Sequence, residues 1–143
     1  MKARISLLAT LTSAASAVLV THYQIHPAGT TDTLHATGEL LFYQANDYLN
    51  AWTNNTVDGG ATIQNANTNI HPYISCDTTV CKCADQPTTF VFEDAGAGAF
   101  VVRNPATNLV WTAADSTIKP STADGSPAQR FIFQPVEMTV PPY

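Results

Sequence analysis

The sequence predicts a single all-β domain of about twelve short strands arranged in three repeats, and three observations support this. Apolar residues that open similar segments lie 38 and 39 residues apart, at Ile25, Ile63 and Val102. Each segment closes on an aromatic residue 27, 27 and 29 residues later, at Trp52, Phe90 and Phe131. No long stretch shows the apolar period of about 3.6 residues that marks an amphipathic helix. Such repeats indicate one supersecondary unit used several times, because one unit alone cannot bury its apolar face.

Short runs of β-branched and aromatic residues between turn residues define the strand candidates. In chain order these are 18–26, 33–36, 39–43, 48–53, 61–65, 70–75, 80–82, 88–93, 99–103, 109–113, 130–134 and 136–139. Pro27-Ala28-Gly29 ends the first candidate, Gly38 separates the next two, and Asn46-Asp47 is a further turn signal. Residues 54–60 are expected to form a loop, because Asn and Asp-Gly favour turns. The run 94–98 separates the second unit from the third.

The first seventeen residues have the pattern of a secretory signal peptide. Lys2 and Arg4 give a positive start, an apolar stretch follows from Ile5 to Leu11, and Ala15-Ser16-Ala17 is a small-residue cleavage pattern. The apolar stretch is too short to span a bilayer. We therefore expect a secreted, extracellular protein whose β-domain occupies residues 18–143.

Charge excludes some classes of partner. Without Lys2 and Arg4, four basic and eleven acidic side chains remain, a net charge of −7 with neutral histidines. A chain this acidic, with no Lys/Arg cluster, is poorly suited to nucleic acids or anionic membranes. Charged residues make up only 12% of the sequence, so the surface depends on Thr, Asn, Ser and Gln. Such surfaces are typical of secreted β-domains that meet neutral partners such as glycans.

All three cysteines, Cys76, Cys81 and Cys83, lie within eight residues. In an oxidising compartment we expect one local disulfide, from Cys76 to either Cys81 or Cys83. The remaining thiol is then free or forms an intermolecular disulfide. A zinc site from His71 and the cysteines is the weaker alternative, because secreted cysteines mostly form disulfides.

Asn54-Asn55-Thr56 is the only acceptor sequon for N-glycosylation in the chain. It falls in the stretch expected to be a loop. We therefore expect Asn54 to be glycosylated in a secreted form of the protein.

The sequence contains no motif that indicates an enzyme. Gly-x-Ser-x-Gly and HExxH are absent, and no cysteine lies in a nucleophile context. A copper site from His22, His26 and His71 would need His22 at the mature N-terminus, but the cleavage pattern places Val18 there. We therefore expect no catalytic residues, no metal and no cofactor.

Three units of about 40 residues that each close on an aromatic strand resemble the β-trefoil, in particular the ricin-B-like lectins. The repeats of that family end in a Q-x-W pattern. Gln129-Arg130-Phe131 matches it with Phe in place of Trp, whereas Thr88-Thr89-Phe90 and Asn50-Ala51-Trp52 keep only the aromatic residue. The resemblance covers residues 18–143 in period and one unit in motif. It implies a single β-trefoil-like domain and a carbohydrate-binding, lectin-like function.

The resemblance also suggests a sugar site, which in that family combines an acidic residue, an aromatic platform and an amide. Asn108, Trp111 and Asp115 are rough equivalents in the third unit, although the acidic residue departs from the family's position. Trp111 is open to two interpretations, a platform that stacks on a sugar ring or a core aromatic residue.

Two further features have competing interpretations. Trp52 closes its unit, and we expect it in the core rather than at a sugar site. The amides of Asn65, Asn67 and Asn69 suit sugar hydroxyls, but Asn more often bonds its own backbone in turns. Turn chemistry is the preferred interpretation.

Two function hypotheses follow. The first is a secreted, non-catalytic protein that binds glycans. The second is a protein-binding role, either as an accessory subunit of a secreted enzyme, similar to the small subunits of some fungal laccases, or as a protease inhibitor. The odd cysteine and the incomplete Q-x-W motifs suit the second, because a trefoil without a sugar site can still bind a protein.

Overall fold

The computed structural model describes residues 18–45 and 47–140, which form twelve strands and two short 3₁₀ helices. The strands are β1 (Val18–Pro27), β2 (Thr33–Ala36), β3 (Leu40–Tyr43), β4 (Trp52–Val57), β5 (Gly60–Asn65), β6 (Tyr73–Cys76), β7 (Cys81–Ala84), β8 (Val91–Gly96), β9 (Ala99–Asn104), β10 (Leu109–Ala114), β11 (Thr117–Ser121) and β12 (Phe131–Val140). The helices are η1 (Tyr48–Asn50) and η2 (Pro127–Gln129). The predicted all-β class is confirmed. The expected signal peptide, residues 1–17, lies outside the described residues.

Six strands form a closed antiparallel barrel. Pairing runs from β1 to β4, β5, β8, β9 and β12 and returns to β1. Three of these links consist of one residue pair each: Tyr23 with Trp52, Ala61 with Phe90, and Phe100 with Phe131. A closed barrel leaves no exposed sheet edge within the ring.

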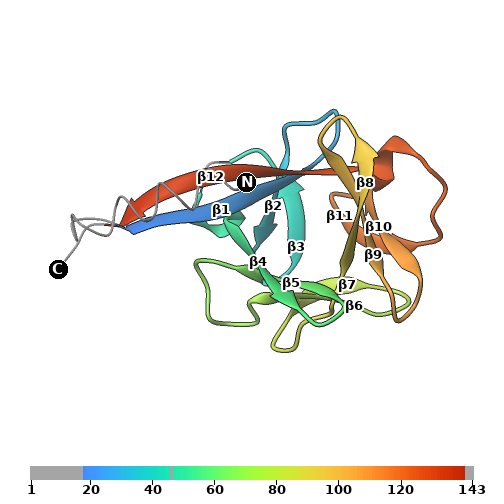
Figure 1. The fold of residues 1–143 in the computed structure, drawn as a ribbon, viewed down its shortest axis with the longest axis horizontal. Helices are drawn as coiled ribbons and strands as arrows, with labels where there is room; N and C mark the ends of the chain where they lie inside the picture. The colour runs from blue at the N-terminus through green and yellow to red at the C-terminus, as the bar shows by residue number, and fades with distance from the viewer. Residues whose placement is uncertain (1–17, 46, 141–143) are drawn as a thin grey trace.

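The other six strands form three hairpins, β2–β3, β6–β7 and β10–β11. Strands β3, β7 and β11 contact one another, so the hairpins meet at one place. Each repeat therefore supplies two barrel strands and one hairpin, and the repeats follow one another from blue to red in Figure 1. This arrangement is the β-trefoil that the repeats predicted.

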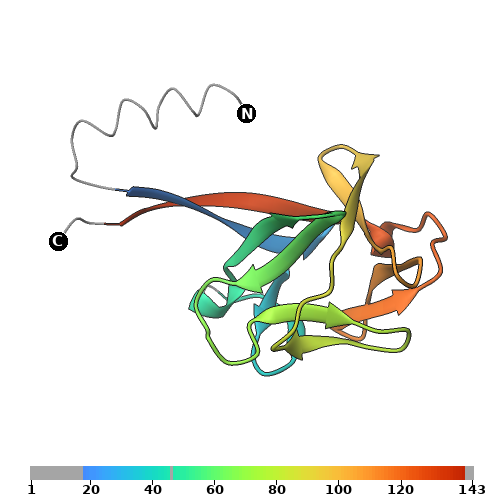
Figure 2. The ribbon, with the colours of Figure 1, turned by 60° about the horizontal axis from the view of Figure 1, so that its bottom comes forward.

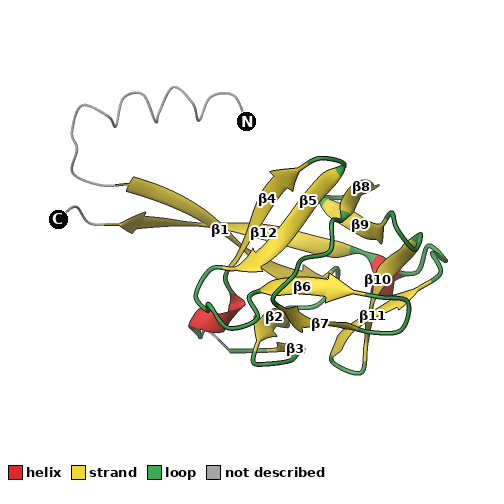
Figure 3. Ribbon diagram, turned by 90° about the horizontal axis from the view of Figure 1, so that it is seen from below, coloured by secondary structure: helices red, strands yellow, loops and turns green. Residues whose placement is uncertain are grey.

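Strands β1 and β12 make the longest pairing, from Val18 opposite Val140 to Pro27 opposite Phe131. One end of this ribbon projects beyond the barrel (Figures 2 and 3). Near the barrel, residues of the ribbon face the connection between β3 and β4. The ribbon thus provides one wall for a cleft described below.

The residues that define the repeat form the centre of the core. The three opening residues and the three closing aromatics are all fully buried: Ile25, Ile63, Val102, Trp52, Phe90 and Phe131. Their spacing in the sequence therefore reports their packing, because equivalent positions of three repeats meet inside one barrel.

The residue two positions before each closing aromatic attaches the barrel to a hairpin of the same repeat. Gln129 Nε2 donates to Thr112 Oγ1 (3.1 Å) and to the carbonyl of Thr122 (2.9 Å). Asn50 Nδ2 donates to Thr33 Oγ1 at 3.2 Å. These buried polar groups are satisfied by hydrogen bonds, as burial requires. The Q-x-W pattern is therefore structural in this chain.

The second repeat makes the same attachment with a shorter side chain. Thr88 Oγ1 accepts from the backbone N–H of Cys76 (2.9 Å) and lies 3.4 Å from Ser75 Oγ. Three different side chains thus connect barrel and hairpin, which explains why the glutamine of the motif is present in only one repeat.

Some predicted boundaries are wrong. Residues 48–50 form η1 rather than a strand, and β11 (Thr117–Ser121) was not expected. The two strands expected at 130–134 and 136–139 are one continuous strand, β12. Pro135 lies inside β12 opposite Tyr23, so the proline does not break the strand.

The stretch expected to be a loop, residues 54–60, is mostly a hairpin. Residues Asn54 to Val57 continue β4 and pair with β5, and only Asp58 and Gly59 form the turn. Pairing with a neighbouring strand outweighs the turn preference of asparagine. The sequon residue Asn54 therefore lies on a strand, with its Oδ1 buried, and its glycosylation stays a prediction.

The disulfide joins Cys76 to Cys81, which face each other across β6 and β7. Cys83 is unpaired within the chain and half-buried. Burial raises the pKa of the Cys83 thiol and Glu39 raises it further, although a hydrogen bond from the Gly38 backbone lowers it. One local pair was predicted, and the structure decides which one.

Gly60→Ala is expected to destabilise the barrel. A Cβ on Gly60 would lie 2.2 Å from the carbonyl oxygen of Phe90, at the bridge that links β5 to β8. Backbone cannot yield as a flexible side chain does, so we expect a loss of about 1–3 kcal/mol in the free energy of unfolding. Urea denaturation followed by circular dichroism measures it.

Gly59→Ala is the matched control for this clash. The neighbouring Gly59 has open space around its Cβ position, but its φ of 82° is unfavourable for alanine. We expect only the cost of a left-handed backbone for alanine, about 1–2 kcal/mol. Equal losses for the two variants would contradict the proposed contact between Gly60 and Phe90.

Trp111→Ala is expected to unfold or strongly destabilise the domain. The indole is 1% exposed and packs edge-on against Phe90 and Phe131, with ring centroids 5.3 and 5.5 Å apart. Deleting so large a buried ring typically costs about 3–5 kcal/mol. The midpoint of thermal unfolding reports the change.

Ile70→Ala provides the comparison, because Ile70 is 76% exposed. We expect a change within about 0.5 kcal/mol. A Trp111→Ala protein as stable as Ile70→Ala would show that the ring lies outside the core.

Candidate saccharide-binding site

The three residues predicted for a sugar site do not form one. Trp111 lies in the core and is buried, so its ring cannot stack on a sugar; the platform interpretation is wrong. Asn108 precedes β10 and Asp115 follows it, so the whole of β10 separates them. Proximity in the sequence does not bring them together, because an extended strand places Asn108 and Asp115 at its opposite ends and Trp111 packs into the core between them.

Asn108 and Asp115 both serve turns. Each has a positive φ, 64° for Asn108 and 53° for Asp115. The Asn108 carbonyl and Oδ1 accept from Arg103 Nη1, at 3.2 and 3.1 Å. Asp115 Oδ2 accepts from Lys119 Nζ at 2.6 Å, and this bond lowers the pKa of the carboxyl group.

Asp115 does line two clefts at the surface. One, of about 370 Å³, lies beside Asp32 and Phe42. The other, of about 320 Å³, lies between the turns of the three hairpins. None of the large aromatic side chains exposed on the surface lines either cleft.

A third cleft, in the first repeat, combines an exposed aromatic ring with polar side chains. It has a volume of about 290 Å³, and its lining residues come from β1, η1, the loop after β5, and β12: His22, Tyr23, Gln24, Asp47, Tyr48, Asn50, Ala51, Asn67 and Val136. Tyr48 is 68% exposed, the most exposed aromatic side chain among the described residues. We call this the Tyr48 cleft.

Asp47 starts the short helix that carries Tyr48. Its Oδ1 accepts from the Leu49 backbone N–H at 3.0 Å, which is the usual role of an aspartate at a helix N-cap. The helix ends at Asn50, whose bond to Thr33 fixes it to β2. The position of the Tyr48 backbone is therefore set from both ends of η1.

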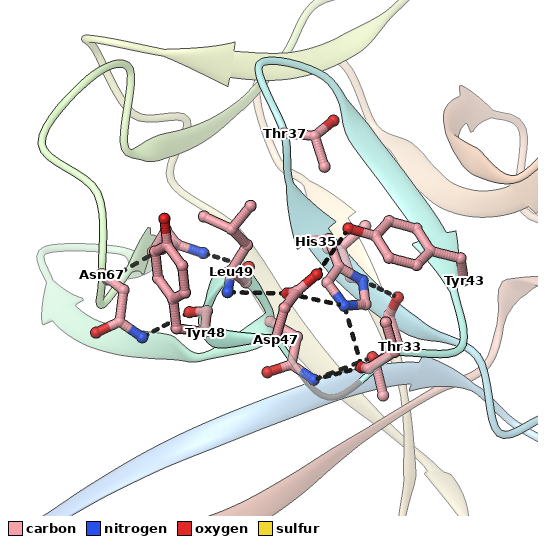
Figure 4. Close-up of polar contacts among 12 residues, drawn as sticks. Thr33, His35, Thr37, Tyr43, Asp47, Tyr48, Leu49 and Asn67 are labelled. Carbon is pink, nitrogen blue, oxygen red and sulfur yellow. Dashed lines mark hydrogen bonds and ion pairs between the residues drawn. The ribbon is translucent and has the colours of Figure 1, made fainter.

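Two asparagines of the second repeat hold the carbonyl groups of η1. Asn65 Nδ2 donates to the Leu49 carbonyl (2.8 Å) and Asn67 Nδ2 to the Tyr48 carbonyl (2.6 Å). Asn65 Oδ1 also accepts from the Asn67 N–H, which is the turn chemistry predicted for these residues. Figure 4 shows Asn67 beside Tyr48.

Behind η1, Asp47 contacts two rings of the first hairpin. Tyr43 donates its hydroxyl to Asp47 Oδ2 at 3.1 Å, and His35 Nε2 lies 3.3 Å from Asp47 Oδ1. The rings of His35 and Tyr43 stack, with centroids 3.7 Å apart and planes 13° from parallel. Desolvation and the Asp47 carboxylate raise the pKa of Tyr43. Figure 4 shows Asp47 between η1 and this ring pair.

The groups in the cleft suit a neutral polyol with an apolar face. An exposed aromatic ring offers a flat surface for the CH groups of a sugar ring. The amide of Asn67, the carboxylate of Asp47 and the amide of Gln24 offer both donors and acceptors for hydroxyl groups. No lysine or arginine lines the cleft.

Sequence reasoning assigned these residues to other roles. The sequence predicts a strand at Tyr48, and for Asn67 it offers sugar binding only as an alternative to the preferred turn chemistry. One local signal does indicate the short helix: Asp47 stands directly before Tyr48-Leu49-Asn50, and aspartate is a good N-cap. Tyr48 and Asn67 lie close together only because strands of different repeats pair with each other.

Within residues 18–45 and 47–140, no group of three or more His, Cys, Asp or Glu side chains is arranged to hold a metal ion. Two of the histidines considered for copper have local partners: His71 Nδ1 lies 2.8 Å from Asp85 Oδ1, and His26 Nδ1 lies 3.2 Å from the Pro27 carbonyl. No helix in these ranges is long and apolar enough to cross a membrane.

Comparison by sequence finds no relatives: no protein-family profile and no curated protein sequence matches the chain. Comparison by structure finds many similar folds. A ricin B-like lectin from Macrolepiota procera, in complex with lactose, is 16% identical, with a TM-score of 0.68 over 80% of this chain and 94% of that one. SeviL, bound to asialo-GM1 saccharide, is 12% identical, with a TM-score of 0.67 over 81% and 97%.

One similar structure is an enzyme, an endo-β-galactosidase from Clostridium perfringens that releases GlcNAcα1-4Gal. It is 13% identical, with a TM-score of 0.71, and the match covers 82% of this chain but only 33% of that one. At these identities the similarity concerns the fold. The chain therefore has the β-trefoil fold found in ricin-B-like lectins.

Proposed function

We propose that this chain is a secreted, non-catalytic carbohydrate-binding protein and that the Tyr48 cleft is its saccharide site. The observation that carries the proposal is the exposed Tyr48 ring, held over a cleft that Asp47 and Asn67 also line. The exposed ring offers a flat apolar face, and stacking on the CH groups of a sugar would remove that face from water.

The structural neighbours support glycan binding. Two of them are complexes with lactose and with asialo-GM1 saccharide. The region that this chain matches in the endo-β-galactosidase is a third of that protein. Fold similarity alone does not assign a ligand, so the argument depends on the cleft.

Secretion is supported by the signal pattern in residues 1–17 and by the disulfide between Cys76 and Cys81. Disulfides persist in oxidising compartments and are uncommon in the cytosol. Val18 is the proposed first residue of the secreted form.

Tyr48→Ala is expected to weaken glycan binding at least tenfold without loss of stability, because the ring is exposed and stacking is the main contact it offers. Binding to an array of neutral oligosaccharides that includes lactose measures the effect. The purified protein without residues 1–17 is used.

Ile70→Ala is the control, since Ile70 is at least as exposed as Tyr48 but does not line the cleft. It should bind as the unmodified protein does. Binding that survives Tyr48→Ala would place the saccharide elsewhere, and no binding to any oligosaccharide would reject a lectin function.

A protein partner is the second candidate, in the role of an accessory subunit of a secreted enzyme or of an inhibitor. The unpaired Cys83 favours it, because an odd thiol in a secreted protein can form an intermolecular disulfide. Its half-buried position and raised pKa reduce its reactivity, which makes this the weaker candidate.

Native purification from culture fluid, with particle size measured before and after a mild reductant, separates the two candidates. For a lectin we expect an acidic monomer whose size does not change on reduction. A larger particle that releases a second polypeptide would instead identify an accessory subunit. Cys83→Ser should then release the partner without reductant.

A further inference from the structure

The His35 ring is fully buried beneath the Tyr48 cleft, and both of its nitrogens face hydrogen-bond acceptors. Nδ1 lies 2.8 Å from the carbonyl oxygen of Thr33. Nε2 lies 3.3 Å from the carbonyl oxygen of Ala45 and 3.3 Å from Asp47 Oδ1. Carbonyl and carboxylate oxygens accept hydrogen bonds and cannot donate them.

The contacts of Nε2 tie His35 to the segment that leads from β3 into η1, because Ala45 and Asp47 both lie in that segment. The Asp47 oxygen that faces Nε2, Oδ1, is also the one that accepts from the Leu49 N–H at the start of η1. A buried polar group that loses its partner is costly, so the buried ring and the carboxylate position each other.

We propose that His35 is a positioning residue of the saccharide site: its buried ring holds Asp47, and Asp47 holds the helix that presents Tyr48. Asp47 accepts from three donors, the His35 ring, the Tyr43 hydroxyl and the Leu49 N–H. This inference rests on the proposed function, because it explains how the cleft is held ready for a saccharide.

The chain contains a matched control. His71 also contacts an aspartate, with its Nδ1 2.8 Å from Asp85 Oδ1, but both side chains are more than half exposed. Water can replace either partner of this exposed pair, so loss of the His71 ring should have little effect on the surrounding structure.

The test follows the backbone amide of Leu49, which reports the bond to Asp47, by NMR of the full secreted chain. We expect this amide signal to shift in His35→Gln, because Asp47 loses a buried partner, and to stay unchanged in His71→Gln.

The same variants then bind the neutral oligosaccharide array. His35→Gln should bind about tenfold more weakly, the scale of one lost hydrogen bond to a charged group. His71→Gln should bind as the unmodified protein does. A Leu49 amide that shifts equally in both variants would overturn the inference.

The inference also fails if His35→Gln leaves both the Leu49 amide and the affinity unchanged. If no variant binds a saccharide, the proposed function fails separately, and the NMR results still decide whether His35 holds Asp47.

Discussion

The fold depends on three narrow links in the barrel, each closed by a buried aromatic residue. Trp52, Phe90 and Phe131 take part in the single-pair contacts that join β4 to β1, β5 to β8, and β12 to β9. Few hydrogen bonds hold these links, so the apolar area that the rings bury must stabilise them. Because each ring comes from a different repeat, the barrel closes only when all three repeats are present.

The polar residue two positions before each closing aromatic connects this apolar centre to the hairpins. Asn50, Thr88 and Gln129 each bond to a hairpin of their own repeat, which sets the hairpin against the barrel. The geometry requires a buried hydrogen-bonding group, and more than one side chain meets that requirement. A repeat can therefore lose the glutamine of its motif and keep its fold.

The three repeats differ at the position two residues before this polar residue. The first repeat carries η1 there, with Tyr48 exposed, whereas the corresponding position before Gln129 in the third repeat is Pro127 in η2. In the second repeat it is Gln86, in a segment without a described helix. Of these three positions, only the first repeat's carries an aromatic ring, and the Tyr48 cleft is completed by Asn67 and Val136 from the other two repeats. The symmetry of the scaffold therefore does not extend to the proposed site.

The sequence by itself determined the all-β class, the three repeats and the six residues at the core centre, because repeat spacing and apolar character reflect burial directly. It also limited the disulfide to one local pair. Only the tertiary structure showed that Trp111 is a core residue, that residues 54–57 form a strand, and where the cleft lies. The physical reason is that Tyr48, Asn67 and His22 come from three separate segments, and their proximity depends on pairing across repeats that no local pattern contains.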